Sequence, residues 1–327
     1  MKEIKLNGER ILPGEEKRVT INIAKLPSHS SINISITVSR AIEDGPVLLV
    51  MGGLHGDEIN GIEIVRRMME KGWHRPSRGT VICVPILNIY GFIFFSRMLP
   101  DGKDVNRSFP GNKNGSLASR LAHYVTHHIL PLIDYGIDFH TGGAQRTNYP
   151  QVRCTFQDEE NLVLAEAFNA PFTLNSPYRA KSLRQTAGKM GKKILVYEGG
   201  ESARFDEFAI IQGMEGARRI MAHLGMIEPV AKSYNENIII RGSSWVRAKN
   251  SGLFNPIVDS GQSVLKNQVV GYITDTFGEF KKSVKSPVTG YVIGLNNNPI
   301  VFQGDALMHL GVTTRDSDFG SDSVDDE

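Results

Sequence analysis

The chain has 327 residues, of which 40% are hydrophobic and 22% are charged, and its formal net charge is +2. This balance is typical of a soluble globular protein of two domains, and it excludes the broad basic field that would favour nucleic acid or an anionic membrane as a partner. No apolar run is long enough to span a bilayer, and residues 1–5 lack the apolar core of a signal peptide, so we expect a cytoplasmic protein.

Up to residue 228 the pattern predicts strands that alternate with helices. Residues 18–40 alternate apolar and polar side chains, which predicts antiparallel strands. After them the sequence predicts buried strands at 46–51, 80–87, 135–140 and 193–197, and helices at 59–72, 116–130, 159–169 and 206–224. Buried strands alternating with helices indicate an α/β domain, here residues 1–228, with a mostly parallel or mixed sheet and helices on both faces.

The composition changes near residue 229 to an all-β pattern. Residues 255–264 and 298–307 are an internal repeat, matching at Asn, Pro, Ile, Val and Gly. We therefore expect residues 229–313 to form a small barrel-sandwich, which resembles the lipoyl carrier domains. A modified carrier domain usually has its exposed Lys between Met residues. None of Lys281, Lys282 and Lys285 is flanked by Met, so we interpret the unit as a structural lid. Residues 314–327 are acidic with almost no apolar content, which predicts a disordered tail.

The first chemical motif is Gly-Gly-Leu-His-Gly-Asp-Glu at 52–58, between a buried strand and a helix. Open α/β sheets place their sites at such strand ends. His55 and Glu58 are three residues apart, and in a first helical turn both would point the same way. An imidazole and a carboxylate so placed suit zinc, although alone the pair also fits a surface His near a helix start.

A third ligand is predicted at the end of the next parallel strand. His140 lies in Asp-Phe-His-Thr-Gly-Gly at 138–143, again followed by a glycine-rich loop. Two histidines and one glutamate leave a fourth position for water, which is the catalytic arrangement of zinc. Asp138 shares a strand face with His140, so it is either a partner that orients the ligand imidazole or a carboxylate in a turn.

Glu198 ends another buried strand, next to Gly199 and Gly200. A carboxylate there is costly unless it has a function. Zinc lowers the pKa of a water to about 7, and a nearby carboxylate can take the proton and pass it on. We therefore predict that Glu198 is the general base and acid; the structural alternative is a helix cap or an ion-pair carboxylate.

The loop from Ser96 to Gly111 is too rich in Gly, Pro and charge to belong to a core. Within it, Arg97 fits polarisation of a scissile carbonyl, and Asn106 with Arg107 fits a clamp on a substrate carboxylate. Arg184, which precedes the Glu198 strand, is either a further ligand of a substrate anion or a solvated surface arginine.

In this order the motifs resemble the succinylglutamate desuccinylase/aspartoacylase family, which is related to zinc carboxypeptidases. The resemblance covers roughly residues 45–225, and no motif position departs from the family pattern. It implies one zinc ion per chain on His55, Glu58 and His140, Glu198 as catalytic acid/base, Arg97 at the carbonyl, and Asn106 with Arg107 at the carboxylate. It also implies that the C-terminal domain partly covers the active-site entrance.

Together these features predict a zinc-dependent amidohydrolase that deacylates a small N-acylated amino acid or amine. The expected partner is a small molecule, not nucleic acid or a membrane, and a homo-oligomer is compatible with the sequence. Two alternatives stay open, a metallocarboxypeptidase acting on peptides and a zinc-binding module without catalysis.

Overall fold

The computed structural model describes residues 3–25, 29, 31–231 and 236–314. As far as residue 231 its elements are β1 (Ile4–Leu6), β2 (Glu9–Ile11), β3 (Glu16–Lys25), β4 (Ser31–Arg40), β5 (Glu43–Met51), α1 (Ile59–Glu70), β6 (Arg78–Val84), α2 (Ile89–Ile93), the 3-10 turn Val105–Arg107, α3 (Leu117–Tyr124), the π-helical turn Val125–Ile129, β7 (Tyr135–Gly142), β8 (Arg146–Cys154), α4 (Glu159–Phe168), β9 (Phe172–Asn175), α5 (Leu183–Lys189), β10 (Lys193–Glu201) and α6 (Glu207–His223). The later elements are β11 (Ile238–Ile240), β12 (Gly242–Arg247), β13 (Gly252–Pro256), β14 (Ser263–Val264), β15 (Val269–Thr274), β16 (Lys281–Lys285), β17 (Gly290–Asn296), β18 (Ile300–Val301) and β19 (Ala306–Val312).

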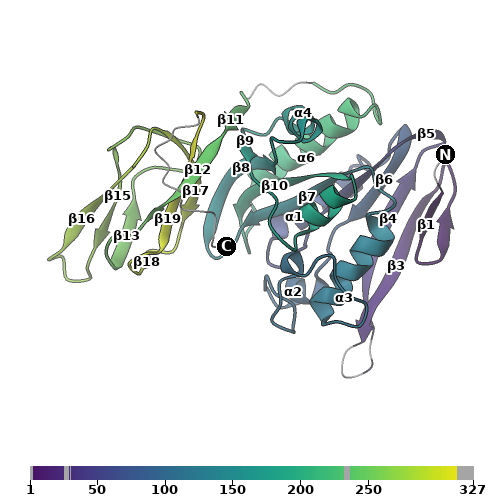
Figure 1. The fold of residues 1–327 in the computed structure, drawn as a ribbon, viewed down its shortest axis with the longest axis horizontal. Helices are drawn as coiled ribbons and strands as arrows, with labels where there is room; N and C mark the ends of the chain where they lie inside the picture. The colour runs from purple at the N-terminus through teal and green to yellow at the C-terminus, as the bar shows by residue number, and fades with distance from the viewer. Residues whose placement is uncertain (1–2, 26–28, 30, 232–235, 315–327) are drawn as a thin grey trace.

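One large mixed sheet runs through the molecule (Figure 1). Its main path is β12-β19-β17-β8-β10-β7-β5-β6-β4-β3. The four strands β6, β5, β7 and β10 are parallel to their neighbours in that group, whereas β3, β4 and β8 join antiparallel. The prediction of antiparallel strands at 18–40 and of a mixed sheet with helices is thus confirmed.

Strand β5 shows why this sheet is buried on both faces. Leu48 and Val50 pack in the cluster that includes residues of α1, α4 and α6. Val47, Leu49 and Met51 pack in the opposite cluster, with residues of α3 and α5. Alternation along the strand therefore fills two cores at once, as a continuous apolar run predicts for a central parallel strand.

The helix predicted at 116–130 differs in its second half. It is α-helical only to Tyr124, and a wider turn follows in which the Leu130 amide donates to the Val125 carbonyl. This i→i+5 bond is a π-type turn, a feature that apolar periodicity does not reveal. The wider turn still buries Val125, Ile129 and Leu130 in the core.

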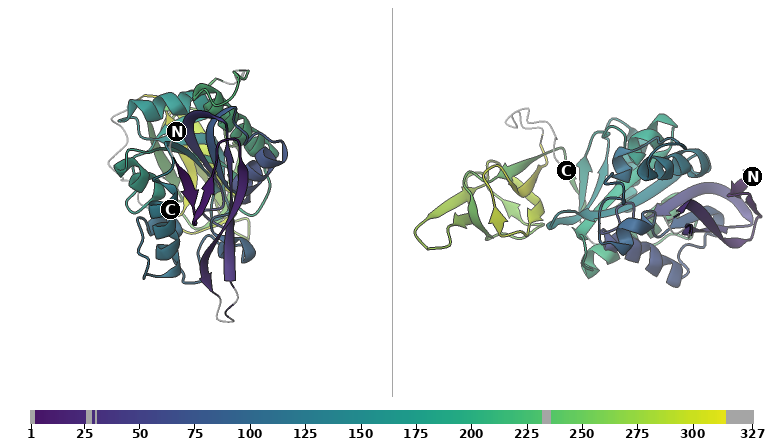
Figure 2. Two further views of the ribbon diagram at one scale, coloured as in Figure 1. Left: turned by 90° about the vertical axis from the view of Figure 1, so that its right-hand side faces the viewer. Right: turned by 90° about the horizontal axis from the view of Figure 1, so that it is seen from below.

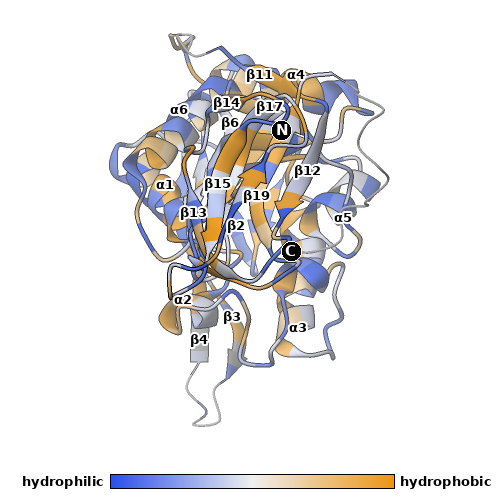
Figure 3. Ribbon diagram, turned by 90° about the vertical axis from the view of Figure 1, so that its left-hand side faces the viewer, coloured by the Kyte–Doolittle hydropathy of each residue, from blue (hydrophilic) through white to orange (hydrophobic). Residues whose placement is uncertain are grey.

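The C-terminal strands extend the large sheet and add a second one. Strand β17 pairs with β8, and β19 and β12 follow it, while β13, β15, β16 and β18 form a four-stranded sheet. Apolar residues of both sheets share one core, and this part lies at one end of an elongated molecule (Figure 2). Seen from that end, orange hydrophobic stretches lie along β15 and β19 (Figure 3).

The internal repeat appears as two equivalent turns. In the first, the Asp259 amide donates to the Gln262 side chain (3.0 Å), and in the second the Phe302 amide donates to the Asp305 side chain (2.8 Å). Gly261 and Gly304 occupy the same place in each, with φ of +90° and +96°, where glycine is favoured. The predicted acidic tail lies outside the described residues, apart from its first position. None of the described helices is long and apolar enough to cross a membrane.

Candidate metal centre and active site

The first two predicted ligands lie in the loop between β5 and α1. The helix begins at Ile59, so His55 and Glu58 precede it, and the expectation that they share a helical turn is wrong. They meet through a loop turn in which the Glu58 amide donates to the His55 carbonyl (3.4 Å). Gly52 explains the tight loop, because a β-carbon there would lie 2.5 Å from the Gly61 carbonyl oxygen at the start of α1.

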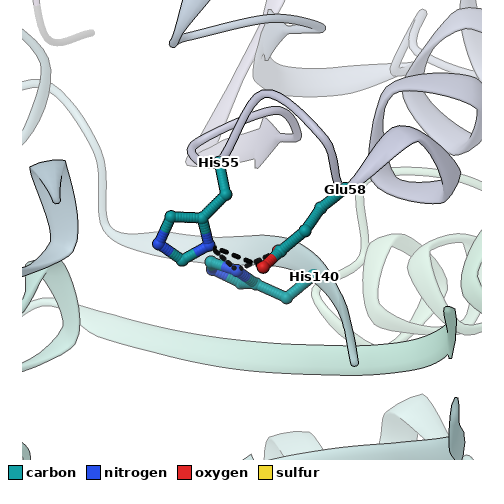
Figure 4. Close-up of side chains that lie close together, drawn as sticks. All are labelled: His55, Glu58 and His140. Carbon is teal, nitrogen blue, oxygen red and sulfur yellow. Dashed lines mark hydrogen bonds and ion pairs between the residues drawn. The ribbon is translucent and has the colours of Figure 1, made fainter. Parts of the chain in front are cut away.

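His140, on β7, completes the cluster (Figure 4). Its Nδ1 lies 2.7 Å from Glu58 Oε2 and 3.2 Å from His55 Nδ1, and His55 Nδ1 lies 2.7 Å from Glu58 Oε1. All three side chains are buried, and one ligand atom of each lies within 4.8 Å of the others. Among the described residues, these three form the group of His, Cys, Asp and Glu side chains that converges closely enough to hold a metal ion.

The outer nitrogen of each imidazole is held by a carboxylate. His140 Nε2 lies 2.8 Å from Asp138 Oδ2, and His55 Nε2 lies 3.2 Å from Asp104 Oδ1. These contacts turn both Nδ1 atoms towards Glu58, the arrangement by which carboxylates orient histidine ligands of metals. The structure therefore favours the interpretation that Asp138 orients the His140 imidazole over that of a carboxylate in a turn. Asp104 was not predicted, although it begins the Asp-x-Asn-Arg motif.

The charges of the cluster fit a cation. Burial alone would lower the pKa of His140, but Asp138 and Glu58 outweigh it and hold that pKa well above its usual value. Burial would likewise raise the pKa of Glu58, yet His55 and His140 hold it well below its usual value. The site therefore stabilises a positive charge at its centre, and two imidazole nitrogens with one carboxylate are a donor set that zinc accepts.

Replacing Asp138 by Asn should lower the affinity for zinc by about 10- to 100-fold, because the imidazole loses the carboxylate that orients it and raises its basicity. Competition with a chromogenic chelator measures the effect. Asp44→Asn, at the opposite end of β5, is the control and should change nothing. Equal affinities of Asp138→Asn and the wild type would show that the contact does not support a metal.

Glu198 lies on the strand next to His140. In the parallel pairing of β10 with β7 the two residues are directly opposite each other, so their side chains share a face of the sheet. Asn148 on β8 donates from Nδ2 to Glu198 Oε2 (3.0 Å), and Arg153 Nη1 lies 3.6 Å from Oε1. The carboxylate is thus buried and held beside the three predicted metal ligands. The sequence did not predict the contacts of Asn148 and Arg153 with it.

Removing the Asn148 amide should lower kcat by about 10-fold, since one hydrogen bond that orients the carboxylate is lost. We expect Asn148→Ala to keep its zinc content and nearly its KM, because Asn148 contacts none of the three ligands. Steady-state kinetics on the preferred substrate measures this, with Asn114→Ala on the surface as control. A kcat equal to that of the wild type would exclude a positioning role.

Arg97 contacts the three predicted metal ligands through Glu58. Its Nη1 donates to Glu58 Oε1 (3.2 Å) and its Nε to Asp104 Oδ2 (3.1 Å). Asp104 therefore bridges Arg97 and His55, which fixes the arginine beside the cluster of His55, Glu58 and His140. Burial would raise the pKa of Asp104, but His55 and Arg97 outweigh it and keep the group ionised.

The predicted carboxylate clamp is partly engaged within the protein. The Asn106 side-chain oxygen accepts from the Leu183 amide (3.0 Å) at the start of α5, and the Asn106 amide donates to Asp104 (2.6 Å). Arg107 Nη1 donates to the Asn106 carbonyl (2.9 Å). Asn106 thus ties the Arg97 loop to α5 through its side-chain oxygen.

Arg184 is buried, so the alternative of a solvated surface arginine is wrong. Its Nη2 donates to Ser176 (3.2 Å) and to the Pro177 carbonyl (2.8 Å). Its Nη1 is buried without a hydrogen-bond partner among the described residues, and burial lowers the pKa of the guanidinium to about 10. A buried cation whose nearest acceptors are neutral favours an approaching anion.

The chain is similar to known proteins in sequence and in fold. The family model of the succinylglutamate desuccinylase/aspartoacylase catalytic domain matches residues 44–224. The chain is 30% identical over 259 residues to the N-alpha-acetyl-L-2,4-diaminobutyric acid deacetylase of Halomonas elongata, an alignment that covers 75% of each protein.

Two solved structures have a similar fold. The product-bound ectoine utilization protein EutE (DoeB) from Ruegeria pomeroyi has a TM-score of 0.83 at 23% identity, over 95% of this chain and 98% of that one. The succinylglutamate desuccinylase/aspartoacylase from Rhodobacter sphaeroides has a TM-score of 0.80 at 25% identity, over 91% and 96%. With the family model matching more than half of its length, the chain belongs to the succinylglutamate desuccinylase/aspartoacylase family.

Proposed function

We propose that the protein is a zinc-dependent deacylase that hydrolyses the amide bond of a small N-acylated amino acid or amine. The observation that carries the proposal is the convergence of His55, Glu58 and His140, with Glu198 directly opposite His140 on the neighbouring strand. The family and the deacetylase from Halomonas elongata support amide hydrolysis on a small N-acyl amino acid.

Each residue has a definite task in this chemistry. Zinc held by the three ligands supplies a Lewis acid that activates water near neutral pH. Glu198 takes one proton from the water as its oxygen adds to the amide carbon, and passes that proton to the nitrogen as the C–N bond breaks. Arg97, fixed by Asp104, stabilises the negative charge on the former carbonyl oxygen. The second proton of the water stays on the new carboxyl group, so the products are an amine and a carboxylic acid, which ionises to a carboxylate near neutral pH.

The remaining predicted residues would bind the rest of the substrate. We assign Asn106 and Arg107 to the carboxylate of the amino acid, since an arginine beside an amide NH₂ fits that group. Arg184 would hold a second acceptor, because its buried Nη1 has no partner among the described residues. We also propose that residues 229–313 form a barrel-sandwich lid, distinct from residues 1–228, that restricts the entrance to small substrates.

A substrate panel tests the proposal. Purified zinc-loaded protein is assayed with N-acetyl and N-succinyl amino acids, N-acetyl diamines, and short peptides with a free carboxyl end. We expect turnover of at least one N-acyl amino acid or amine, and none of the peptides. Hydrolysis of peptides alone would favour a metallocarboxypeptidase. Zinc bound without turnover of any member would favour a binding module.

A further inference from the structure

Strand β10 is irregular directly after Glu198. Glu198 pairs with His140 and Glu201 pairs with Gly142, so β10 advances by three residues where β7 advances by two. Such an extra residue is a β-bulge, a feature that is frequent beside active sites and changes the direction of a side chain. Gly200 within the bulge has a φ of +78°, where glycine is favoured. Whatever holds this bulge therefore also fixes the direction of the Glu198 side chain.

Asn60, the second residue of α1, holds the bulge. Its Nδ2 donates to the carbonyl oxygen of Gly199, the residue after Glu198 (3.2 Å). In the described strands neither β7 nor β8 pairs with Gly199, so the Asn60 amide takes the place of a strand neighbour. Its Oδ1 accepts a hydrogen bond from the amide of Asp206, the N-cap of α6 (3.0 Å). Both polar atoms of this fully buried side chain are thus engaged.

The first turn of α1 contacts two strands of the site, β7 and β10. A β-carbon at Gly61 would lie 2.5 Å from the Phe139 carbonyl oxygen on β7. A β-carbon at Gly200 on β10 would lie 2.4 Å from Nδ2 of Asn60. Glycine at both positions lets the helix approach the two strands closely. Because Glu58 immediately precedes this helix, its first turn connects the predicted metal ligands with the bulge of β10.

We propose that Asn60 is a positioning residue of the reaction, which aims the Glu198 carboxylate by holding the carbonyl of Gly199. This role rests on the proposed deacylase function, in which Glu198 transfers the proton. Asn148 holds the end of the Glu198 side chain, whereas Asn60 fixes the backbone from which it projects. A catalytic group displaced by about 1 Å can lower the rate about 100-fold, so Asn60 can affect turnover without contacting the substrate.

Asn60→Ala tests the proposal, since alanine forms neither hydrogen bond and still favours a helix. We expect kcat to fall about 10- to 100-fold, while KM and the zinc affinity change by less than about 3-fold. Steady-state kinetics and competition with a chromogenic chelator measure these quantities. A purely structural residue would lower the melting temperature and leave kcat unchanged.

Asn161→Ala is the matched control for this variant. Asn161 is also a buried asparagine in the first turn of a helix, α4. Its replacement should destabilise the fold to a similar extent, but kcat should change by less than about 3-fold. A kcat of wild-type size in Asn60→Ala, or equal losses of kcat in the two asparagine variants, would overturn the proposal.

Gly200→Ala approaches the same contact from β10. Its new β-carbon would lie 2.4 Å from Asn60 Nδ2, so the amide must move, and kcat should fall at least about 10-fold. Gly191→Ala is the control, because Gly191 also has a positive φ (+73°) but open space around its β-carbon. It should retain kcat within about 3-fold. Unchanged kcat in Gly200→Ala would contradict the proposal even if Asn60→Ala does not fold.

Crystal structures test the position of Glu198 independently of turnover. In Asn60→Ala or Gly200→Ala we expect the Glu198 carboxylate to move by more than about 1 Å relative to the wild type, and to stay in place in Asn161→Ala. A wild type that hydrolyses no member of the substrate panel would reject the proposed function, and these structures would still decide the role of Asn60. An unmoved Glu198 carboxylate in both variants would contradict it.

Discussion

Replacing Glu198 by Gln should reduce kcat by about 100- to 10,000-fold while the bound zinc stays in place. A general acid–base residue contributes a factor of this size. Glutamine has nearly the same shape and can still accept the hydrogen bond from Asn148, so the surroundings should persist, but its amide cannot take up a proton. Elemental analysis of zinc beside steady-state kinetics on the preferred substrate measures both quantities.

Glu201 supplies the matched control for this experiment. It is a second buried carboxylate on β10, and it accepts a hydrogen bond from Asn297 Nδ2 (2.8 Å) instead of facing Asn148. Glu201→Gln should therefore lower kcat by less than about 10-fold. Equal losses in the two variants would mean that replacing either carboxylate of β10 disturbs the site in the same way. The assignment of Glu198 as general acid and base would then be wrong.

Removal of a ligand should have the second large effect. His140→Ala deletes one of three metal donors, so we expect the zinc affinity to fall by more than about 100-fold, beyond the loss that an outer carboxylate causes. Turnover should disappear with the metal. Because a ligand that binds only the folded state raises its stability, zinc should also raise the melting temperature of the wild type and leave that of the variant unchanged.

His127→Ala is the control for the ligand experiment. His127 lies in the π-helical turn Val125–Ile129, where its ring centre is 4.1 Å from that of His123. It does not belong to the group of His55, Glu58 and His140. Zinc content and melting temperature should match the wild type. Zinc that remains bound at full affinity in His140→Ala would locate the metal elsewhere and refute the assignment of the ligands.

The ligand cluster could be predicted because short-range patterns point to it. His55 and Glu58 follow one buried strand, His140 lies near the carboxyl end of a second, and Glu198 lies near the carboxyl end of a third. Parallel strands bring their carboxyl ends to one edge of a sheet, so apolar runs followed by glycines were enough to bring these side chains together. The local geometry of the first pair was less predictable, since α1 begins only at Ile59 and its first turn packs directly on the loop at Gly52.

Strand β8 was missed, and with it the residues that hold Glu198. Pro150 interrupts the segment, and Asn148 and Arg153 are polar where a strand in the middle of a sheet is expected to be apolar. Both side chains contact the buried carboxylate of Glu198, so they are polar at positions where the strand pattern expects apolar residues. Asp104 was overlooked for another reason, since its partners Arg97 and His55 are brought together only by the fold.

The continuation of the sheet into the C-terminal strands lies beyond any local pattern. Gly294 pairs with Asn148 and His309 pairs with Gly294 across long separations in the chain. The repeat at 255–264 and 298–307 predicted β structure, and its two glycine turns are equivalent, but neither observation says which edge joins the large sheet. That edge decides which C-terminal strand lies beside β8, the strand that contacts Glu198.

The most direct test is a zinc titration of metal-stripped protein, followed by turnover of the N-acyl amino acid that the panel identifies. We predict no turnover without metal, a linear recovery that ends at about one zinc per chain, and no recovery in Glu198→Gln although it binds zinc equally well. Turnover that persists without metal, or that returns equally in Glu198→Gln, would contradict a zinc-dependent deacylase built on these residues.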